Sequence, residues 1–160
     1  PREVLMSFVT DPLISDSDRE YTLRNLGRYL SPSDLEAEAL LKTLWDRDER
    51  NPISDTANSL LIDVFHDEEA ISWRCEFLKK SAKPFHRQEG GHSVGNFELE
   101  MDSLSFAKPL IDLKDEKYLL ASCTEEQLEN CKKTGKPLKL GYFKKSGWTG
   151  IVVKTIVLCC

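Results

Sequence analysis

The sequence predicts a mainly α-helical chain, built as a short solenoid of antiparallel helix pairs, on three observations. Apolar residues recur at three- and four-residue steps through the first 85 residues. Short breaks that carry proline separate these periodic stretches, and proline ends a helix because it lacks a backbone N–H. The composition, 40% hydrophobic and 31% charged over 160 residues, is typical of a folded soluble domain with a core of its own.

Four helices are expected in the first 85 residues. Tyr21, Leu23, Leu26, Tyr29 and Leu30 form an apolar stripe along residues 17–30. A second helix begins at Ser33, whose hydroxyl caps free N–H groups with Glu36 three residues on, and it ends at Asn51-Pro52. The third and fourth helices span residues 54–65 and 67–81, and Pro84 ends the last one.

These four helices suggest a repeat of helix pairs. Moving the first pair along by 34 residues lays Leu26 on Leu60, and a shift of 33 lays Leu44 on Phe77. Pairs that cannot bury their apolar face alone are typical of a stacked helical solenoid, here closest to a HEAT-like repeat. The residues expected to point inward are Leu26, Leu30, Leu41, Leu44, Leu60, Val64, Trp73 and Phe77.

The rest of the chain changes character, so we divide it into a helical-repeat segment, 1–120, and a lysine-rich tail, 121–160. Residues 86–96 are expected to form a glycine-rich loop, followed by short helices over 97–107 and 111–120. In the tail, a capped helix starts at Thr124 and ends before Gly135. Two strand-like runs, 137–143 and 148–158, allow a C-terminal β-hairpin, which needs other elements to pack on.

Charge is divided unevenly along the chain. Residues 1–130 hold 15 basic and 27 acidic side chains, whereas residues 131–160 hold seven lysines and no acid. Such asymmetry marks either a tail for nucleic acid or a membrane surface, or a contact between a basic end and an acidic body.

The termini and cysteines indicate a cytoplasmic location. No secretory signal and no apolar run long enough to span a membrane is present. Five cysteines at irregular spacing do not form a disulfide framework, which favours a reducing compartment. Because the first residue is proline, a fragment or a processed chain is expected.

No motif in the sequence predicts catalysis, a cofactor or a metal. His86 and His92 have a spacing seen in zinc sites but lack accompanying cysteine pairs. Cys123 and Cys131 lack a neighbouring histidine that would activate a thiol, and no phosphate-binding loop is present. The expected function is therefore non-catalytic binding of a protein partner.

Five residues are the candidate binding residues. Trp45 and Trp73 are core residues by default, but either would anchor a partner if exposed. Lys144, Lys145 and Trp148 combine positive charge with an aromatic ring, which supports an alternative function in nucleic-acid binding. The acidic body argues against that alternative because it repels phosphates.

Residues 67–85, DEEAISWRCEFLKKSAKPF, with HSVG at 92–95 and FAKPLIDLKDEKY at 106–118, resemble a segment of large bacterial, especially cyanobacterial, NACHT-type NTPases. The similarity covers about residues 15–120 and stops after Tyr118. It implies a helical-repeat region that serves as sensor or scaffold beyond a nucleotide-binding module. That module is not in this chain, so the resemblance implies no catalytic residue here.

Overall fold

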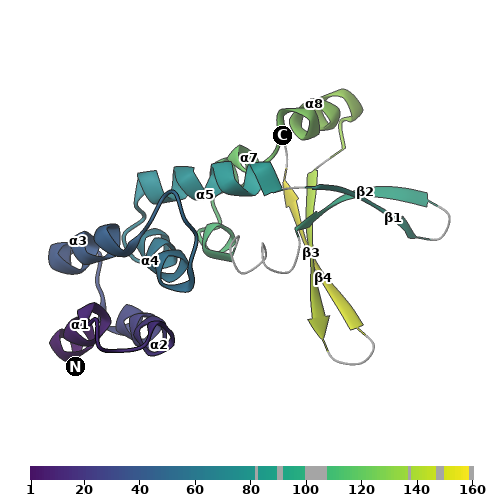
Figure 1. The fold of residues 1–160 in the computed structure, drawn as a ribbon. Helices are drawn as coiled ribbons and strands as arrows, with labels where there is room; N and C mark the ends of the chain where they lie inside the picture. Colours follow the sequence, from purple (N-terminus) through teal and green to yellow (C-terminus); the bar gives the residue numbers. More distant parts are fainter. Residues whose placement is uncertain (82, 90–91, 100–107, 137, 147–149, 159–160) are drawn as a thin grey trace. The chain divides into compact units, whose positions relative to one another are not determined.

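The structure is a computed structural model that describes residues 1–81, 83–89, 92–99, 108–136, 138–146 and 150–158. Side chains are described for residues 1–80 and 108–136. The chain divides into two compact units, Pro1–Ile71 and Ser72–Cys160, and each is described by itself. Figure 1 traces both units along the chain.

The first unit is helical throughout its regular structure. Its elements are α1 (Arg2–Thr10), α2 (Asp16–Leu26), the 3-10 turn η1 (Gly27–Tyr29), α3 (Leu35–Leu44), α4 (Pro52–Asp63) and the beginning of α5 (Glu68–Ser81). The mainly helical character expected from the sequence is confirmed here. Helix α1 was not among the four helices expected.

Short polar side chains set the start of α2, α3 and α4. Ser15 accepts a hydrogen bond from the Asp18 N–H at the start of α2, and Asn51 accepts one from the Ser54 N–H at the start of α4. At α3 the capping residue is Asp34, not Ser33 as expected, because the Asp34 carboxylate reaches the Ala37 N–H. The Asn51-Pro52 pair was expected to end the preceding helix, but α3 already ends at Leu44. The pair instead begins α4, where proline needs no donor.

The helices of the first unit pack in a different order from the expected one. Helix α1 packs on α2, α3 packs on α4, and α2 packs on α4. The sequence had instead paired residues 17–30 with 33–50. Because α1 packs beside α2, α3 is paired with α4 and not with α2. That these pairs form a HEAT-like solenoid stays a prediction.

The core of this unit is formed by small and branched apolar residues. Its fully or nearly fully buried members are Val9, Leu23, Leu26, Ala37, Leu41, Trp45, Ala57, Leu61, Ile62, Ala70 and Ile71. Four residues expected to point inward are only half-buried, namely Leu30, Leu44, Leu60 and Val64. Gly27 fits closely against α4, since a Cβ atom at this position would lie 2.6 Å from Leu60 Cδ2.

The second unit combines helices with strands. Its helices include the remainder of α5, a helical turn over 108–112, α7 (Glu116–Ala121) and α8 (Glu125–Thr134). Its strands are β1 (Lys83–Glu89), β2 (His92–Leu99), β3 (Leu138–Ser146) and β4 (Gly150–Leu158), in the order β1-β2-β3-β4. β1 and β2 are antiparallel, β2 and β3 are parallel, and β3 and β4 are antiparallel (Figure 1).

Two expectations for this unit differ from the structure, and one is confirmed. Residues 86–96, expected as a loop, belong mostly to β1 and β2, and 97–99 end β2 where a helix was expected. The other residues of that helix lie outside the described ones. Helix α8 begins and ends where expected, with a Thr124–Gln127 capping box and Gly135 at φ 64°. The C-terminal segment, in which the sequence allows a β-hairpin, contains β3 and β4.

Candidate functional site

Exposed apolar side chains are concentrated near the start of the chain. Among the residues whose side chains are described, every large hydrophobic residue that is strongly exposed lies within the first 35 positions. They are Val4, Phe8, Leu13, Tyr21, Tyr29 and Leu35. Val4 and Phe8 stand one turn apart on α1, and Val9, on another side of that helix, is fully buried. Exposed apolar side chains that share one helix face, as Val4 and Phe8 do, mark an interaction surface more often than scattered single residues do.

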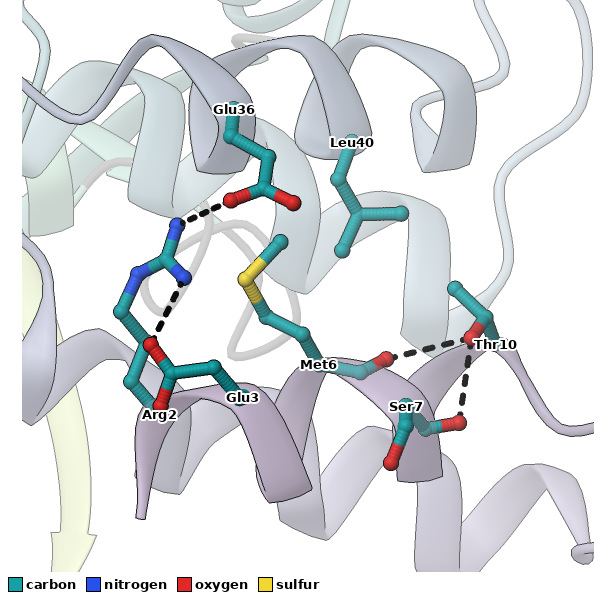
Figure 2. A pocket seen from close by; sticks show the side chains of 7 residues that line it. All are labelled: Arg2, Glu3, Met6, Ser7, Thr10, Glu36 and Leu40. Carbon is teal, nitrogen blue, oxygen red and sulfur yellow. Dashed lines mark hydrogen bonds and ion pairs between the residues drawn. The ribbon is translucent and has the colours of Figure 1, made fainter.

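A shallow hollow of about 400 Å³ lies between α1 and α3. Arg2, Glu3, Met6, Ser7 and Thr10 line it from α1, and Glu36 and Leu40 line it from α3. Figure 2 shows the Met6 side chain pointing toward α3, with the Arg2–Glu36 ion pair at one end. At the other end, Thr10 donates its hydroxyl to the backbone carbonyls of Met6 and Ser7 (Figure 2). The middle is therefore apolar and the ends are polar.

Arg2 is the electrostatic link between α1 and α3. Its Nε and Nη2 atoms donate to the two carboxylate oxygens of Asp34 at 2.6 and 2.7 Å, and Nη2 also donates to Glu36 at 3.0 Å. The hydrogen bond from Arg2 lowers the pKa of Asp34, and the Ala37 N–H lowers it further. The same bonds, first to Asp34 and then to Glu36, raise the pKa of Arg2. Because acids already surround this guanidinium, the hollow is not an anion site.

The two tryptophans named as candidate anchors occupy different surroundings. Trp45 is only 3% exposed and follows α3, with the Arg47 guanidinium 4.1 Å from the ring centroid. Trp73, on α5, is half-buried and stacks on Phe77 with ring centroids 5.8 Å apart. Trp45 is thus a core residue in this structure, whereas part of Trp73 reaches solvent. Neither contributes to the exposed apolar surface on α1 and α2.

The lysine-rich candidates cannot be assembled into a site. Lys144 and Lys145 lie on β3, opposite Val152 and Ile151 of β4, but only their backbone is described. Trp148 lies outside the described residues. Lys132, Lys133 and Lys136, in and just after α8, are exposed. The nucleic-acid reading of this tail therefore stays a prediction.

Cys75 and Cys123, in the second unit, are not arranged as nucleophiles. Cys75 and Cys123 are free and buried, and their sulfurs lie 3.4 Å from the carbonyl oxygens of Tyr118 and Leu119. Burial raises the pKa of both thiols to about 11, which suppresses the reactive thiolate. Cys131 on α8 is disulfide-bonded, a departure from the expectation of reduced thiols.

We expect the stability of the chain to fall between about pH 9 and pH 11. Both thiols ionise near pH 8.5 in an unfolded chain and at about 11 when folded. Between these values the unfolded state has released protons that the folded state still holds, so rising pH favours unfolding. Urea titrations at a series of pH values will measure this loss. A Cys75→Ala, Cys123→Ala double variant serves as the control, and its curve should be flatter. An identical slope in both proteins would contradict the assignment.

The sequence itself carries signals for the exposed side chains of α1. Residues 4–9, VLMSFV, are apolar with the helical spacing of Val4 and Phe8, and Arg2 and Glu3 precede them. Tyr21 and Tyr29 belong to the apolar stripe expected along residues 17–30, in which tyrosine counts as apolar. In the structure both are more than half exposed.

Within the described residues, no three His, Cys, Asp or Glu side chains gather closely enough to hold a metal ion. None of the described helices combines the length and hydropathy needed to cross a membrane. No family model, curated protein or solved structure shows significant similarity to this chain.

Proposed function

We propose that this chain is a non-catalytic helical segment that binds a protein partner through the exposed face of α1 and α2. The observation that carries the proposal is the concentration of exposed apolar side chains in the first 35 residues. Exposed apolar and aromatic side chains favour association. Their burial against a partner removes apolar surface from water, which lowers the free energy of the complex.

The packing of the first unit supports a repeat-like scaffold. α1 and α2 form one pair, α3 and α4 form a second, and α2 packs on α4. Stacked pairs of this kind offer extended surfaces for partners. A HEAT-like region of a NACHT-type NTPase, acting as sensor or scaffold in the cytoplasm, is the assembly that we propose for it. This assignment rests on the resemblance in residues 67–118.

Site-specific crosslinking tests the binding surface. The photoreactive amino acid p-benzoylphenylalanine replaces Phe8 in one variant and Glu49, an exposed acid in the α3–α4 connection, in the control. In cells that naturally make the chain, irradiation should join position 8 to discrete proteins that mass spectrometry can identify. A further Val4→Ser substitution should weaken this crosslink several-fold. Equal crosslinking from position 49, or none from position 8, would refute the proposal.

Sequencing the DNA that flanks the coding segment tests the proposed assembly. A phosphate-loop NTPase in the same reading frame upstream supports the NACHT-type scaffold. An independent gene with no such neighbour would leave the binding surface intact but would remove the NTPase from the proposal.

Nucleic-acid binding through the lysine-rich tail is the alternative. It predicts binding that falls steeply with salt and disappears when residues 131–160 are removed. Protein crosslinks from position 8 would not depend on that tail.

A further inference from the structure

A stripe of tyrosine and arginine runs along the exposed side of α2 and η1. Tyr21 and Tyr29 are 68% and 52% exposed, and Arg24 and Arg28 between them are exposed as well. Tyr21, Arg24 and Arg28 follow one another at three- and four-residue steps, which places them on one side of a helix. Leu23 and Leu26, on the other side of the same helix, are fully buried.

This stripe is positive in a unit that is otherwise acidic. Residues 1–71 contain 16 acidic and seven basic side chains, yet residues 21–33 contain Arg24, Arg28 and no acid. Arg24 pairs with Glu20 on the preceding turn of α2 while its side chain stays 69% exposed. Within the part of the chain that the structure describes, Arg28 forms no ion pair. At this end of α2, Arg28 therefore offers its charge to a partner, whereas Arg24 shares its charge with Glu20.

Helix electrostatics account for only part of the stripe. Arginines near the end of α2 interact favourably with the negative end of the helix dipole. That effect gives no reason for two exposed tyrosines beside them. Tyrosine and arginine together are the residue types most enriched in the energetically important centres of protein interfaces, because each combines apolar area with hydrogen-bonding groups.

We propose that the partner presents an acidic protein segment to this stripe. Its carboxylates pair with the guanidinium groups of Arg24 and Arg28, which match a carboxylate in geometry and charge. Its aliphatic stems pack between the rings of Tyr21 and Tyr29. The inference rests on the proposed function and adds the chemistry of the partner to it.

Fluorescence anisotropy on the full chain tests this inference. The probe is a fluorescein-labelled peptide of glutamate and alanine, and oligothymidine of matched length is the competing probe. Replacing both arginines (Arg24→Gln, Arg28→Gln) should weaken peptide binding about ten-fold. Replacing Lys132 and Lys133 of α8 by glutamine removes the same charge from another exposed place, and it should change binding less than about two-fold.

The tyrosines provide a test at constant charge. Tyr21→Ala with Tyr29→Ala should weaken peptide binding several-fold, and phenylalanine at both positions should restore most of it. Equal losses from the arginine and lysine pairs would show only general charge attraction and overturn the inference. So would a larger effect of the arginine pair on oligothymidine than on the peptide. In either case the crosslink from position 8 would persist, whereas failure of the proposed function removes that crosslink itself.

Discussion

Leu26→Ala is expected to lower the free energy of unfolding of the first unit by about 2–5 kcal/mol. Leu26 is the last residue of α2 and is fully buried. It precedes Gly27, which fits closely against Leu60 of α4. Truncation to alanine removes apolar area from the core and leaves a cavity, because tightly packed neighbours relax only partly.

The matched control is the same substitution at the surface. Leu13 is 92% exposed, so Leu13→Ala should change the free energy by no more than about 0.5 kcal/mol. Urea unfolding followed by Trp45 fluorescence reports the first unit when Trp73 and Trp148 are replaced by phenylalanine in every protein compared. Equal effects at positions 26 and 13 would contradict the core described above.

Asp34→Ala is expected to have the second-largest effect. The carboxylate of Asp34 caps α3 and receives two hydrogen bonds from Arg2. Loss of the cap alone costs about 1 kcal/mol, and the total is larger because Arg2 also loses its main partner on α3. Asp34→Asn keeps a good capping residue but removes the charge, so its destabilisation should be the smaller of the two.

The pH dependence separates the charge of Asp34 from its capping role. The folded-state pKa of Asp34 lies below its ordinary value. As pH falls through the ordinary carboxyl range, the unfolded chain binds a proton that the folded chain does not, so stability declines. Acid titration of unfolding should show this decline in the natural chain, and a weaker one in Asp34→Asn. A steeper decline in Asp34→Asn would refute the Arg2–Asp34 contact.

Helices of the first unit could be predicted from the sequence because their signals are local. Proline, the short polar capping residues and the three- and four-residue apolar steps fix where α4 and α5 occur to within two residues. The Thr124 capping box and Gly135 did the same for α8. Helix starts were still misplaced by a residue where two capping side chains stood in a row, as at Ser33 and Asp34.

Pairing and burial could not be predicted, because they depend on which helices meet. The apolar stripe of α2 does not determine whether Tyr21 or Thr22 faces the core. In the structure Thr22 is buried and Tyr21 is exposed. Once α1 lies against α2, the partner of every later helix changes. The Arg2–Asp34 contact joins residues that are 32 positions apart in the chain, so no local sequence pattern predicts it.

The strands β1 and β2 were missed for a related reason. Residues 86–96 contain three glycines and few branched residues, so local propensity favours a loop. Their backbone pairing is antiparallel over seven residue pairs, from Lys83 with Glu98 to Glu89 with His92. Pairing between these two neighbouring segments overrides the weak strand propensity of each one. The apolar residues 4–9 indicate part of the candidate surface on α1, but which of them are exposed is decided by the packed unit.

Because Gly27 fits closely against Leu60, the substitutions that evolution accepts at one of these positions depend on the residue at the other. A methyl group at position 27 would collide with the Leu60 side chain, which must first turn away or become smaller. Gly27→Ala is thus tolerated more easily after Leu60→Val than before it. In a lineage of such chains, the residue at position 60 therefore influences how readily a side chain is accepted at position 27. Natural variation at position 27 should therefore accompany a smaller residue at position 60.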